Sequence, residues 1–349
     1  MFPGIALGRA LVERGDVEVL FVGSARGLEA RAVPAAGFRL VTIGARQVRG
    51  GGVARALRGG AALLLGVTSA LRALLRFRPD VVVGVGGYAS VPTVLSAAIL
   101  RKPVLLLEQN VVPGATNRML GRLARCVCTS FPETAVSFPG VRVVCTGNPV
   151  RPEVLGIAEA RASASAVGPT TLLVIGGSAG AHRLNVGLGD ALACSGRSVD
   201  GLRVVHQTGE ADADATRARY AALGVEAEVR PFFDDMAPVY HTADFAVCRA
   251  GATTIAELLV VGIPAVLVPY PFAADDHQRR NAEAVAAAGA GVIVLERDLT
   301  AERLRAEIDG MLGDPARRRR MAAAARTLAR PDAARAVAAE CALLAGGRP

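Results

Sequence analysis

Short runs of Val, Leu and Ile alternate along the whole chain with alanine-rich stretches that have the apolar spacing of amphipathic helices. Each run is apolar at consecutive positions, which is typical of a parallel strand covered by helices on both faces. The runs that carry this pattern are Val17–Val22, Val81–Val85, Val104–Leu107, Arg142–Thr146, Thr171–Ile175, Arg203–Gln207, Ala243–Cys248 and Ala265–Pro269. The alternation predicts an α/β fold built from doubly wound, Rossmann-like sheets.

The length of 349 residues is about twice that of an ordinary domain, so we expect two domains. A stretch rich in Ala, Ser and Gly, Ala158–Pro169, reads as an exposed connection, and Thr171 then begins a fresh strand. We place the domain boundary near Gly147–Arg151, with a first domain of residues 1–147 and a second of residues 148–330. The two doubly wound units are expected to face each other across a cleft, because ligands of such sheets bind beyond the carboxyl ends of the strands.

Residues 81–100 contain no charged residue and are long enough to span a bilayer. Gly84, Gly86, Gly87 and Pro92 interrupt this stretch, so a strand, a glycine loop and a short helix of a water-exposed domain explain it better. The six cysteines show no repeated spacing and no signal peptide precedes them, which favours reduced thiols in the cytosol. A zinc site is not expected, because no second cysteine pair or nearby histidine accompanies Cys126 and Cys128.

Two glycine-rich loops follow predicted strands: Gly84-Val85-Gly86-Gly87-Tyr88 and Gly176-Gly177-Ser178-Ala179-Gly180-Ala181. Glycines at these places let backbone amides approach an anion, and the helix that follows favours negative charge. Neither loop has the glycine spacing of a dinucleotide site, so NAD is not expected. The second loop also matches the nucleophile elbow of hydrolases, with Ser178 as nucleophile and His206, His241 or His277 as base. From the loop alone, the phosphate site and the hydrolase both remain open.

Three further segments end predicted strands and carry polar side chains. The segment Ala252–Glu257 places the carboxylate of Glu257 one turn into a helix, where it can accept hydrogen bonds from the vicinal diol of a ribose. Alternatively, Thr254-x-x-Glu257 is a capping box, in which the carboxylate accepts a hydrogen bond from the backbone. Gln278 suits sugar hydroxyls because it both donates and accepts hydrogen bonds. Glu108-Gln109-Asn110 offers a candidate general base or an orienting group, or else a helix cap.

These motifs together resemble the MurG family of bacterial glycosyltransferases, which add N-acetylglucosamine to a lipid-linked muramyl-pentapeptide. The resemblance runs over nearly the whole chain in the family's order. The residues that carry it are Gly84–Tyr88, Glu108–Asn110, Pro113-Gly114, Thr116-Asn117, Gly147–Arg151, Gly176–Ala181, Gln207, Asp234–Met236, Cys248–Glu257, Pro269–Gln278 and Asn281.

The resemblance implies a GT-B fold, with two Rossmann-like domains and a last helix, about residues 331–349, that returns to the first domain. It implies contacts to the UDP-sugar donor, most of them in the second domain, from Asn110, Arg151, Ser178, Phe233, Ala252, Thr253, Thr254, Ile255, Ala256, Glu257 and Gln278. It also implies an acceptor or diphosphate loop formed by Gly84, Gly86, Gly87 and Tyr88. Ser178 then binds the diphosphate and is not a nucleophile, and Glu108 is the candidate catalytic base or orienting group.

The implied reaction is an inverting transfer of N-acetylglucosamine from UDP-N-acetylglucosamine to the 4-hydroxyl of an undecaprenyl-diphospho-muramyl-pentapeptide, in peptidoglycan synthesis. No metal or cofactor is expected, because helix dipoles and Arg151 can stabilise the departing UDP. The alternatives are an α/β hydrolase that uses Ser178, or an inactive truncated member of the family. The truncated member is considered because the chain starts at Met1-Phe2-Pro3-Gly4. In the family, the first strand and the Gly-Gly-Thr-x-Gly-His loop have just ended at this point.

The net charge of +9 is confined to one segment. Between Glu29 and Asp80 the chain has nine arginines and no acidic residue, so this segment holds the whole excess. Apolar residues such as Leu63–Leu65, Leu74 and Leu75 lie among these arginines, a mixture that suits an anionic membrane surface. We therefore expect a peripheral protein at the cytoplasmic face of the cell membrane, docked through the Arg46–Arg78 region. Nucleic acid is not an expected partner, since interleaved aromatic residues and a helix-turn-helix signature are missing.

Overall fold

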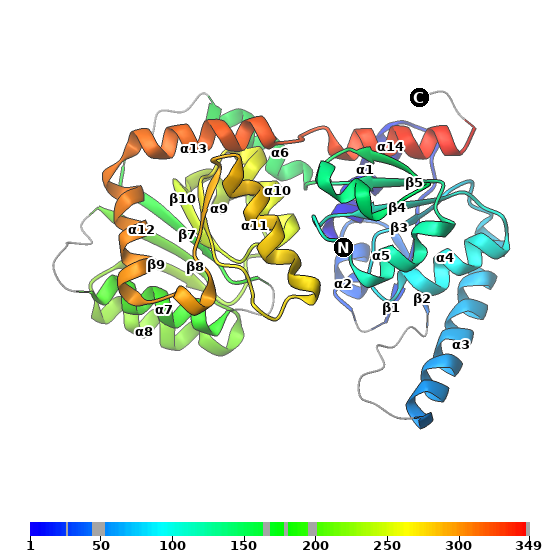
Figure 1. Cartoon of the computed structure of the whole chain (residues 1–349), viewed down its shortest axis with the longest axis horizontal. Helices are drawn as coiled ribbons and strands as arrows, with labels where there is room; N and C mark the ends of the chain where they lie inside the picture. The colour runs from blue at the N-terminus through cyan, green and yellow to red at the C-terminus, as the bar shows by residue number, and fades with distance from the viewer. Residues whose placement is uncertain (26, 44–52, 163–167, 178–180, 195–200, 347–349) are drawn as a thin grey trace. The chain divides into compact units, whose positions relative to one another are not determined.

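The computed structural model describes the whole chain apart from residues 26, 44–52, 163–167, 178–180, 195–200 and 347–349 (Figure 1). It divides into two compact units, Met1–Arg151 with Pro331–Pro349 (unit 1) and Pro152–Arg330 (unit 2). The division after Arg151 lies four residues beyond the end of the predicted first domain. Arg151, assigned from sequence to the donor-binding part, accordingly belongs to unit 1.

Unit 1 contains two parallel sheets in its described residues, one of β1 and β2 and one in the order β3-β4-β5-β6. Its helices and strands, with short 3₁₀ helices marked η, are α1 (Phe2–Glu13), β1 (Leu20–Ser24), α2 (Glu29–Ala35), β2 (Arg39–Ile43), α3 (Val53–Phe77), β3 (Val82–Gly84), α4 (Ser90–Ile99), β4 (Val104–Glu108), α5 (Ala115–Leu120), η1 (Gly121–Leu123), β5 (Cys126–Thr129), η2 (Pro132–Ser137), β6 (Arg142–Cys145) and α14 (Ala333–Leu344). The uncharged stretch 81–100 therefore forms a strand, a loop and a helix, as predicted.

The last helix, α14, packs against α1 in unit 1 (Figure 1). Val337, Ala338 and Cys341 join Leu7 of α1 and Leu105 of β4 in one buried cluster. The guanidinium of Arg142 on β6 also pairs with the carboxylate of Glu340 on α14, its Nη2 lying 2.9 Å from Oε1. Apolar burial and this ion pair together hold the C-terminal segment on the first unit.

Unit 2 has one six-stranded parallel sheet in the order β12-β11-β10-β7-β8-β9. Its elements are α6 (Pro152–Ala162), β7 (Thr170–Ile175), α7 (His182–Ala193), β8 (Leu202–Gln207), η3 (Glu210–Asp212), α8 (Ala213–Ala222), β9 (Glu226–Arg230), α9 (Ala237–Thr242), β10 (Phe245–Cys248), α10 (Ala252–Val261), β11 (Ala265–Leu267), η4 (Ala274–Asp276), α11 (His277–Ala287), β12 (Gly291–Ile293), η5 (Glu296–Asp298), α12 (Ala301–Gly313) and α13 (Pro315–Leu328). The predicted α/β architecture with parallel sheets in two domains is confirmed.

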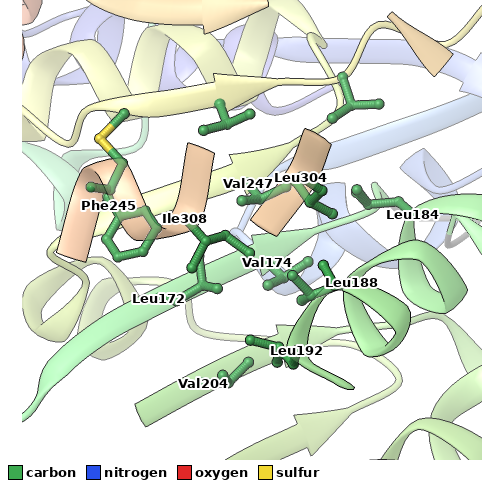
Figure 2. Close-up of a cluster of buried hydrophobic side chains, with 14 of the residues drawn as sticks. Leu172, Val174, Leu184, Leu188, Leu192, Val204, Phe245, Val247, Leu304 and Ile308 are labelled. Atoms are coloured by element: carbon green, nitrogen blue, oxygen red, sulfur yellow. The ribbon is translucent and has the colours of Figure 1, made fainter. Parts of the chain in front are cut away.

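The core of unit 2 fills the space between the middle of its sheet and the helices α7 and α12 (Figure 2). Leu172 and Val174 on β7 and Val247 on β10 are completely buried there, beneath Leu188 of α7 and Ile308 of α12. Burial of side chains of this size stabilises a fold by about 1.5–3 kcal/mol each. The central strands are thereby fixed, and the loops at their carboxyl ends are presented from a rigid base.

Candidate functional site

The order of strands in unit 2 reverses between β7 and β10. Chain order runs outward from β7 through β8 and β9 on one side and from β10 through β11 and β12 on the other. The two strands pair as far as Ile175 and Cys248, and the amide of Arg249 donates to the carbonyl of Ile175 at 3.1 Å. The loops that begin at Gly176 and Arg249 therefore leave the sheet side by side, at the kind of place where doubly wound sheets bind their ligands.

Helix α10 begins in the second of these loops without a side-chain cap. Its N-cap residue is Gly251, and the first backbone bond runs from the amide of Ile255 to the carbonyl of Gly251, at 2.9 Å. The amides of Ala252, Thr253 and Thr254 consequently have no partner among the described residues. An uncapped helix start with a partial positive charge is suited to a phosphate group.

Glu257 does not take part in a capping box. Thr254 is the third residue of α10 rather than its N-cap, and the carboxylate of Glu257 accepts a hydrogen bond from the Tyr240 hydroxyl at 2.8 Å. The Glu257 side chain is 2% exposed, one turn into the helix whose start faces the loop after β7. The capping alternative from the sequence is therefore wrong, while the interpretation of Glu257 as a ribose ligand stays a prediction.

Gln207, at the end of β8, joins two loops of this edge. Its side-chain nitrogen donates to the carbonyl of Gly177 at 3.2 Å, and its side-chain oxygen accepts from the amide of Phe233 at 3.3 Å. Phe233 itself is buried, with the guanidinium of Arg230 5.4 Å from the centre of its ring. In the sequence, Gln207 stands out only as part of a motif, and its position at the end of a strand is the signal for this role.

Arg249 was not predicted as a site residue, yet from the loop after β10 it contacts the two neighbouring loops at the carboxyl edge. Its Nη1 donates to the carbonyls of Val268 and Pro269 at 3.2 and 3.4 Å, and its Nη2 lies 2.5 Å from Oε2 of Glu296. Its guanidinium also stacks 5.4 Å from the ring of Tyr270. Arg249 thus ties the loops after β10, β11 and β12 into one surface beside the start of α10.

The loop after β11 is also held by Gln278. The side-chain oxygen of Gln278 accepts from the amide of Tyr270 at 3.0 Å, so the side chain is oriented by the loop itself. Its side-chain nitrogen makes no hydrogen bond within the described residues, which leaves a donor for a ligand. The described residues contain no cluster of three metal-ligating groups, at Asp275-Asp276-His277 or elsewhere.

In unit 1, the carboxylate of Glu108 at the end of β4 is buried and surrounded by donors. Oε1 accepts from the amide and the side chain of Asn110 at 2.9 and 3.1 Å. Oε2 accepts from the amide of Gly114 at 3.1 Å and from the side chain of Asn117 at 2.9 Å. With four donors already bound, the carboxylate orients the loop 109–117, and its geometry favours the orienting role over that of a base.

The glycine loop after β3 lies next to this network. Gly86 and Gly87 have φ values of +83° and +78°, a left-handed conformation that residues with a side chain rarely adopt. A Cβ atom on Gly86 would lie 3.6 Å from the side-chain nitrogen of Asn117, and Tyr88 is 60% exposed. The side-chain oxygen of Asn117 is buried without a hydrogen-bond partner. The loops after β3 and β4 therefore meet at an edge that retains an unused acceptor.

The remaining predicted residues have different outcomes. The side chain of Arg151 stacks on the ring of Phe2, its guanidinium carbon 5.1 Å from the ring centre. Ser178 lies outside the described residues, so its predicted contact to diphosphate is neither placed nor excluded.

His206, a candidate base for a hydrolase, is fully buried between Tyr220 and Asn185, and burial lowers its pKa to about 3. Its two ring nitrogens are used within the core, and nothing supports the hydrolase.

Comparison with known proteins identifies relatives along the whole chain. Residues 1–129 match the glycosyltransferase family 28 N-terminal domain and residues 171–337 the glycosyltransferase family 28 C-terminal domain. A UDP-N-acetylglucosamine--N-acetylmuramyl-(pentapeptide) pyrophosphoryl-undecaprenol N-acetylglucosamine transferase from Geobacter sulfurreducens is 44% identical over 344 residues, covering 97% of this chain and 94% of the relative. The enzyme of the same name from Anaeromyxobacter sp. is 46% identical, covering 98% of this chain and 89% of the relative.

Solved structures with a similar fold include an enzyme of the same family. Acinetobacter baumannii MurG superposes with a TM-score of 0.77 at 33% identity, over 97% of this chain and 95% of that one. The UDP-GlcNAc 2-epimerase from Neisseria meningitidis, bound to UDP-GlcNAc, has a TM-score of 0.69 at 12% identity, over 98% and 96% of the two chains. The second likeness concerns the fold alone.

Proposed function

This chain belongs to glycosyltransferase family 28 and, within it, to the MurG family, and we propose on this premise that it transfers N-acetylglucosamine from UDP-N-acetylglucosamine to undecaprenyl-diphospho-muramyl-pentapeptide. The observation that carries the proposal is the uncapped start of α10 beside the glycine loop of β7, at the point where the strand order reverses. A nucleoside diphosphate suits this edge because the start of α10 carries a partial positive charge at the point where doubly wound sheets bind their ligands.

The donor is assigned to the carboxyl edge of unit 2. The diphosphate faces the amides of Ala252, Thr253 and Thr254, and Ser178 is assigned to the same diphosphate from the sequence motif alone. Glu257 accepts hydrogen bonds from the ribose hydroxyls, and Phe233 packs near the uracil. Gln278 contacts the sugar with its side-chain nitrogen. Gln207 and Arg249 touch neither substrate and hold the loops in position through the contacts described above.

The transfer inverts the anomeric carbon of N-acetylglucosamine. The 4-hydroxyl oxygen of the acceptor sugar attacks this carbon, the bond to the UDP oxygen breaks with both electrons on UDP, and a base takes the hydroxyl proton. The dipole of α10 stabilises the negative charge that builds up on UDP, without a metal. Glu108, with Asn110, orders the loop 109–117 of unit 1. This loop lies next to the glycine loop Gly84–Tyr88, which is assigned to the acceptor.

The direct test is acceptor-dependent UDP release by the chain as it stands. UDP-N-acetylglucosamine and a detergent-dispersed lipid-linked muramyl-pentapeptide are supplied together and separately, and the glycolipid product is identified by its mass. UDP release that requires both substrates, with a product heavier by one N-acetylglucosamine residue, supports the proposal. A folded protein that binds UDP but transfers no sugar to this acceptor contradicts it.

We also infer that unit 1 docks on the anionic cytoplasmic surface of the membrane through α3. One face of α3 packs inward, with Ala70 and Leu74 buried, but Leu64, Leu65 and Leu75 are 68%, 67% and 54% exposed. Among the described residues, one segment is long and apolar enough to cross a bilayer, judged by length and composition alone: residues 60–77 of α3. An amphipathic helix that lies in the interface accounts for the same leucines and for the arginines among them.

The arginines assigned to this docking region divide into two groups. Arg46 and Arg49 lie outside the described residues, and the structure describes no side chain for Arg55 or Arg58. Arg72, Arg76 and Arg78, on and just after the last turns of α3, are exposed and described. Retention on vesicles that contain anionic lipid at low salt, and release at high salt, tests the docking independently of catalysis. A failure to bind such vesicles contradicts it.

A further inference from the structure

The loop after β11 carries two aromatic side chains at the surface of unit 2, Tyr270 and Phe272. Their ring centres lie 5.7 Å apart and their planes are inclined at 70°, so the edge of one ring meets the face of the other. Phe272 is the more exposed of the two and takes no part in the core cluster described for unit 2. A single exposed ring is not by itself a binding site, so its neighbours decide what it can do.

The ring of Tyr270 connects Phe272 to the start of α10. The guanidinium of Arg249 lies 5.4 Å from the centre of the Tyr270 ring, and Arg249 precedes the N-cap Gly251 by only two residues. The exposed fraction rises along this row, from 8% for Arg249 to 42% for Tyr270 and 81% for Phe272. The three side chains therefore form a row that runs outward from the helix start to the surface.

A polar group of the same loop lies beside this row. The side-chain oxygen of Gln278 accepts from the amide of Tyr270 at 3.0 Å, which leaves the side-chain nitrogen as a donor. Between Phe272 and Gln278, Asp275 and Asp276 have φ values of +53° and +54°, a left-handed conformation that turns the chain. The loop thus folds back on itself and presents an aromatic ring and an amide donor together.

This combination of groups suits a sugar ring. One face of a pyranose carries axial C–H bonds with a partial positive charge, and the face of an aromatic ring is negative, so the two attract each other. The hydroxyl groups at the rim of the sugar accept hydrogen bonds from an amide such as that of Gln278. The position fits as well, because a sugar attached to a diphosphate at the start of α10 lies further out, along the row that ends at Phe272.

We propose that Phe272 is a specificity-determining residue for the donor, with its ring stacked on the pyranose ring of N-acetylglucosamine and supported from behind by Tyr270. The inference rests on the proposed function, in which Gln278 contacts the same sugar, and it adds the apolar contact to that site. UDP lacks the transferred sugar and does not reach Phe272. The ring consequently holds the donor and contributes nothing to the binding of the product UDP.

Isothermal titration of the full-length wild type and of Phe272→Ala, with UDP-N-acetylglucosamine and with UDP, tests this assignment. The variant is expected to lose roughly tenfold in affinity for UDP-N-acetylglucosamine, the order of one lost aromatic contact, and to bind UDP like the wild type. Phe272→Tyr keeps the ring and is expected to restore the affinity for UDP-N-acetylglucosamine. In the transfer assay, Phe272→Ala should raise the KM for the donor and leave the KM for the acceptor unchanged.

The control is Val186→Ala, which shortens an exposed apolar side chain on α7 of the same unit and should leave both affinities unchanged. Equal losses for UDP and UDP-N-acetylglucosamine in Phe272→Ala mean that the ring only orders its loop, and they overturn the proposal. An unchanged affinity for UDP-N-acetylglucosamine overturns it too, and weaker binding of the lipid-linked acceptor would then assign the ring to the acceptor. Circular dichroism melts verify that the variants fold.

The two proposals fail in different ways. A chain that transfers sugar to the detergent-dispersed acceptor, but whose Phe272→Ala variant keeps the wild-type affinity for the donor, loses only the stacking contact. A chain whose Phe272→Ala variant selectively loses UDP-N-acetylglucosamine, but which transfers no sugar to the muramyl acceptor, keeps the stacking contact and loses the proposed reaction.

Discussion

The side-chain amide of Asn117 donates to the Glu108 carboxylate at 2.9 Å and to the carbonyl of Leu107 at 2.8 Å. Both residues are 3% exposed, and the contact fastens the start of α5 to the end of β4. Together with the bonds from Asn110 and Gly114, it gives both oxygens of Glu108 two donors each. The carboxylate is thus the centre around which the loop 109–117 is built.

Glu108→Gln is expected to lower kcat at least tenfold and to destabilise unit 1 by about 1–3 kcal/mol, because the new amide group faces two donors. Asn117→Ala removes the same contact from the other side. In a double-mutant cycle the two changes should be strongly non-additive, since they act on one network. If Glu108 is instead the base, Glu108→Gln abolishes turnover, while Asn117→Ala leaves kcat nearly intact.

Arg249→Gln is expected to weaken UDP binding roughly tenfold or more by releasing the loops after β11 and β12 from the start of α10. The variant leaves the Glu296 carboxylate without its close partner, a loss that costs several kcal/mol when the surroundings are buried. Arg249→Lys restores the charge but not the forked contacts to Val268, Pro269 and Glu296, and should recover little affinity. Isothermal titration with UDP measures the effect.

The control for Arg249 is Arg217→Gln, which breaks an exposed pair with Asp214 in the same unit. Such surface pairs contribute about 0–1 kcal/mol, so UDP affinity should not change. Equal UDP affinity in Arg249→Gln and the wild type would show that the loops keep their positions without this residue.

Glu257→Ala is expected to reduce the affinity for UDP by about 1.5–3 kcal/mol, as is typical for lost hydrogen bonds to a charged group. The same substitution should reduce the affinity for 2′-deoxy-UDP much less, because the diol that Glu257 recognises is incomplete there. Tyr240→Phe serves as the comparison, since it removes only the hydroxyl that donates to Glu257. Equal losses for UDP and its 2′-deoxy analogue in Glu257→Ala would mean that the residue acts only on the fold.

The buried His206 is expected to make the stability of unit 2 depend on pH. Burial lowers its pKa in the folded state to about 3, below the value of 6.5 for an exposed histidine, so the unfolded chain binds the extra proton between these values. The stabilisation from neutral His206 is complete above pH 6.5 and is lost as the pH falls towards 3, by up to about 1.4 kcal/mol per pH unit.

Denaturant titrations of the wild type and His206→Gln at pH 7.5 and pH 5 test this dependence. The variant is expected to be less stable at pH 7.5, because the contacts to Tyr220 and Asn185 are altered, but to lose less stability between the two pH values. His277→Gln, at a half-buried histidine whose Nδ1 lies 2.7 Å from the carbonyl of Ala274, is the control. A pH dependence that is unchanged in His206→Gln would assign it to other groups.

Much of the fold follows from local sequence. Consecutive apolar residues at 104–107 and 171–175 predict buried parallel strands, because each must be covered on both faces, and both strands are present. The edge strand β9 was missed because Glu226–Arg230 alternates charged and apolar residues instead of forming a continuous apolar run. Strand β2 was also missed, because it is not buried along its whole length: its first residue, Arg39, is exposed and only Ile43 is fully buried.

The sequence by itself determined which chemistry is available: glycines that allow close approach of an anion, a carboxylate in the first turns of α10, and one basic segment rich in leucine. Only the tertiary structure decided how these groups are used. It made Glu257 a partner of Tyr240 rather than a cap, and it surrounded Glu108 with donors from residues two to nine positions further along the chain. It also brought the ring of Tyr270 into contact with both Arg249 and Phe272. The physical reason is that a hydrogen bond or ion pair depends on where the chain returns in space, which the spacing along one segment does not specify.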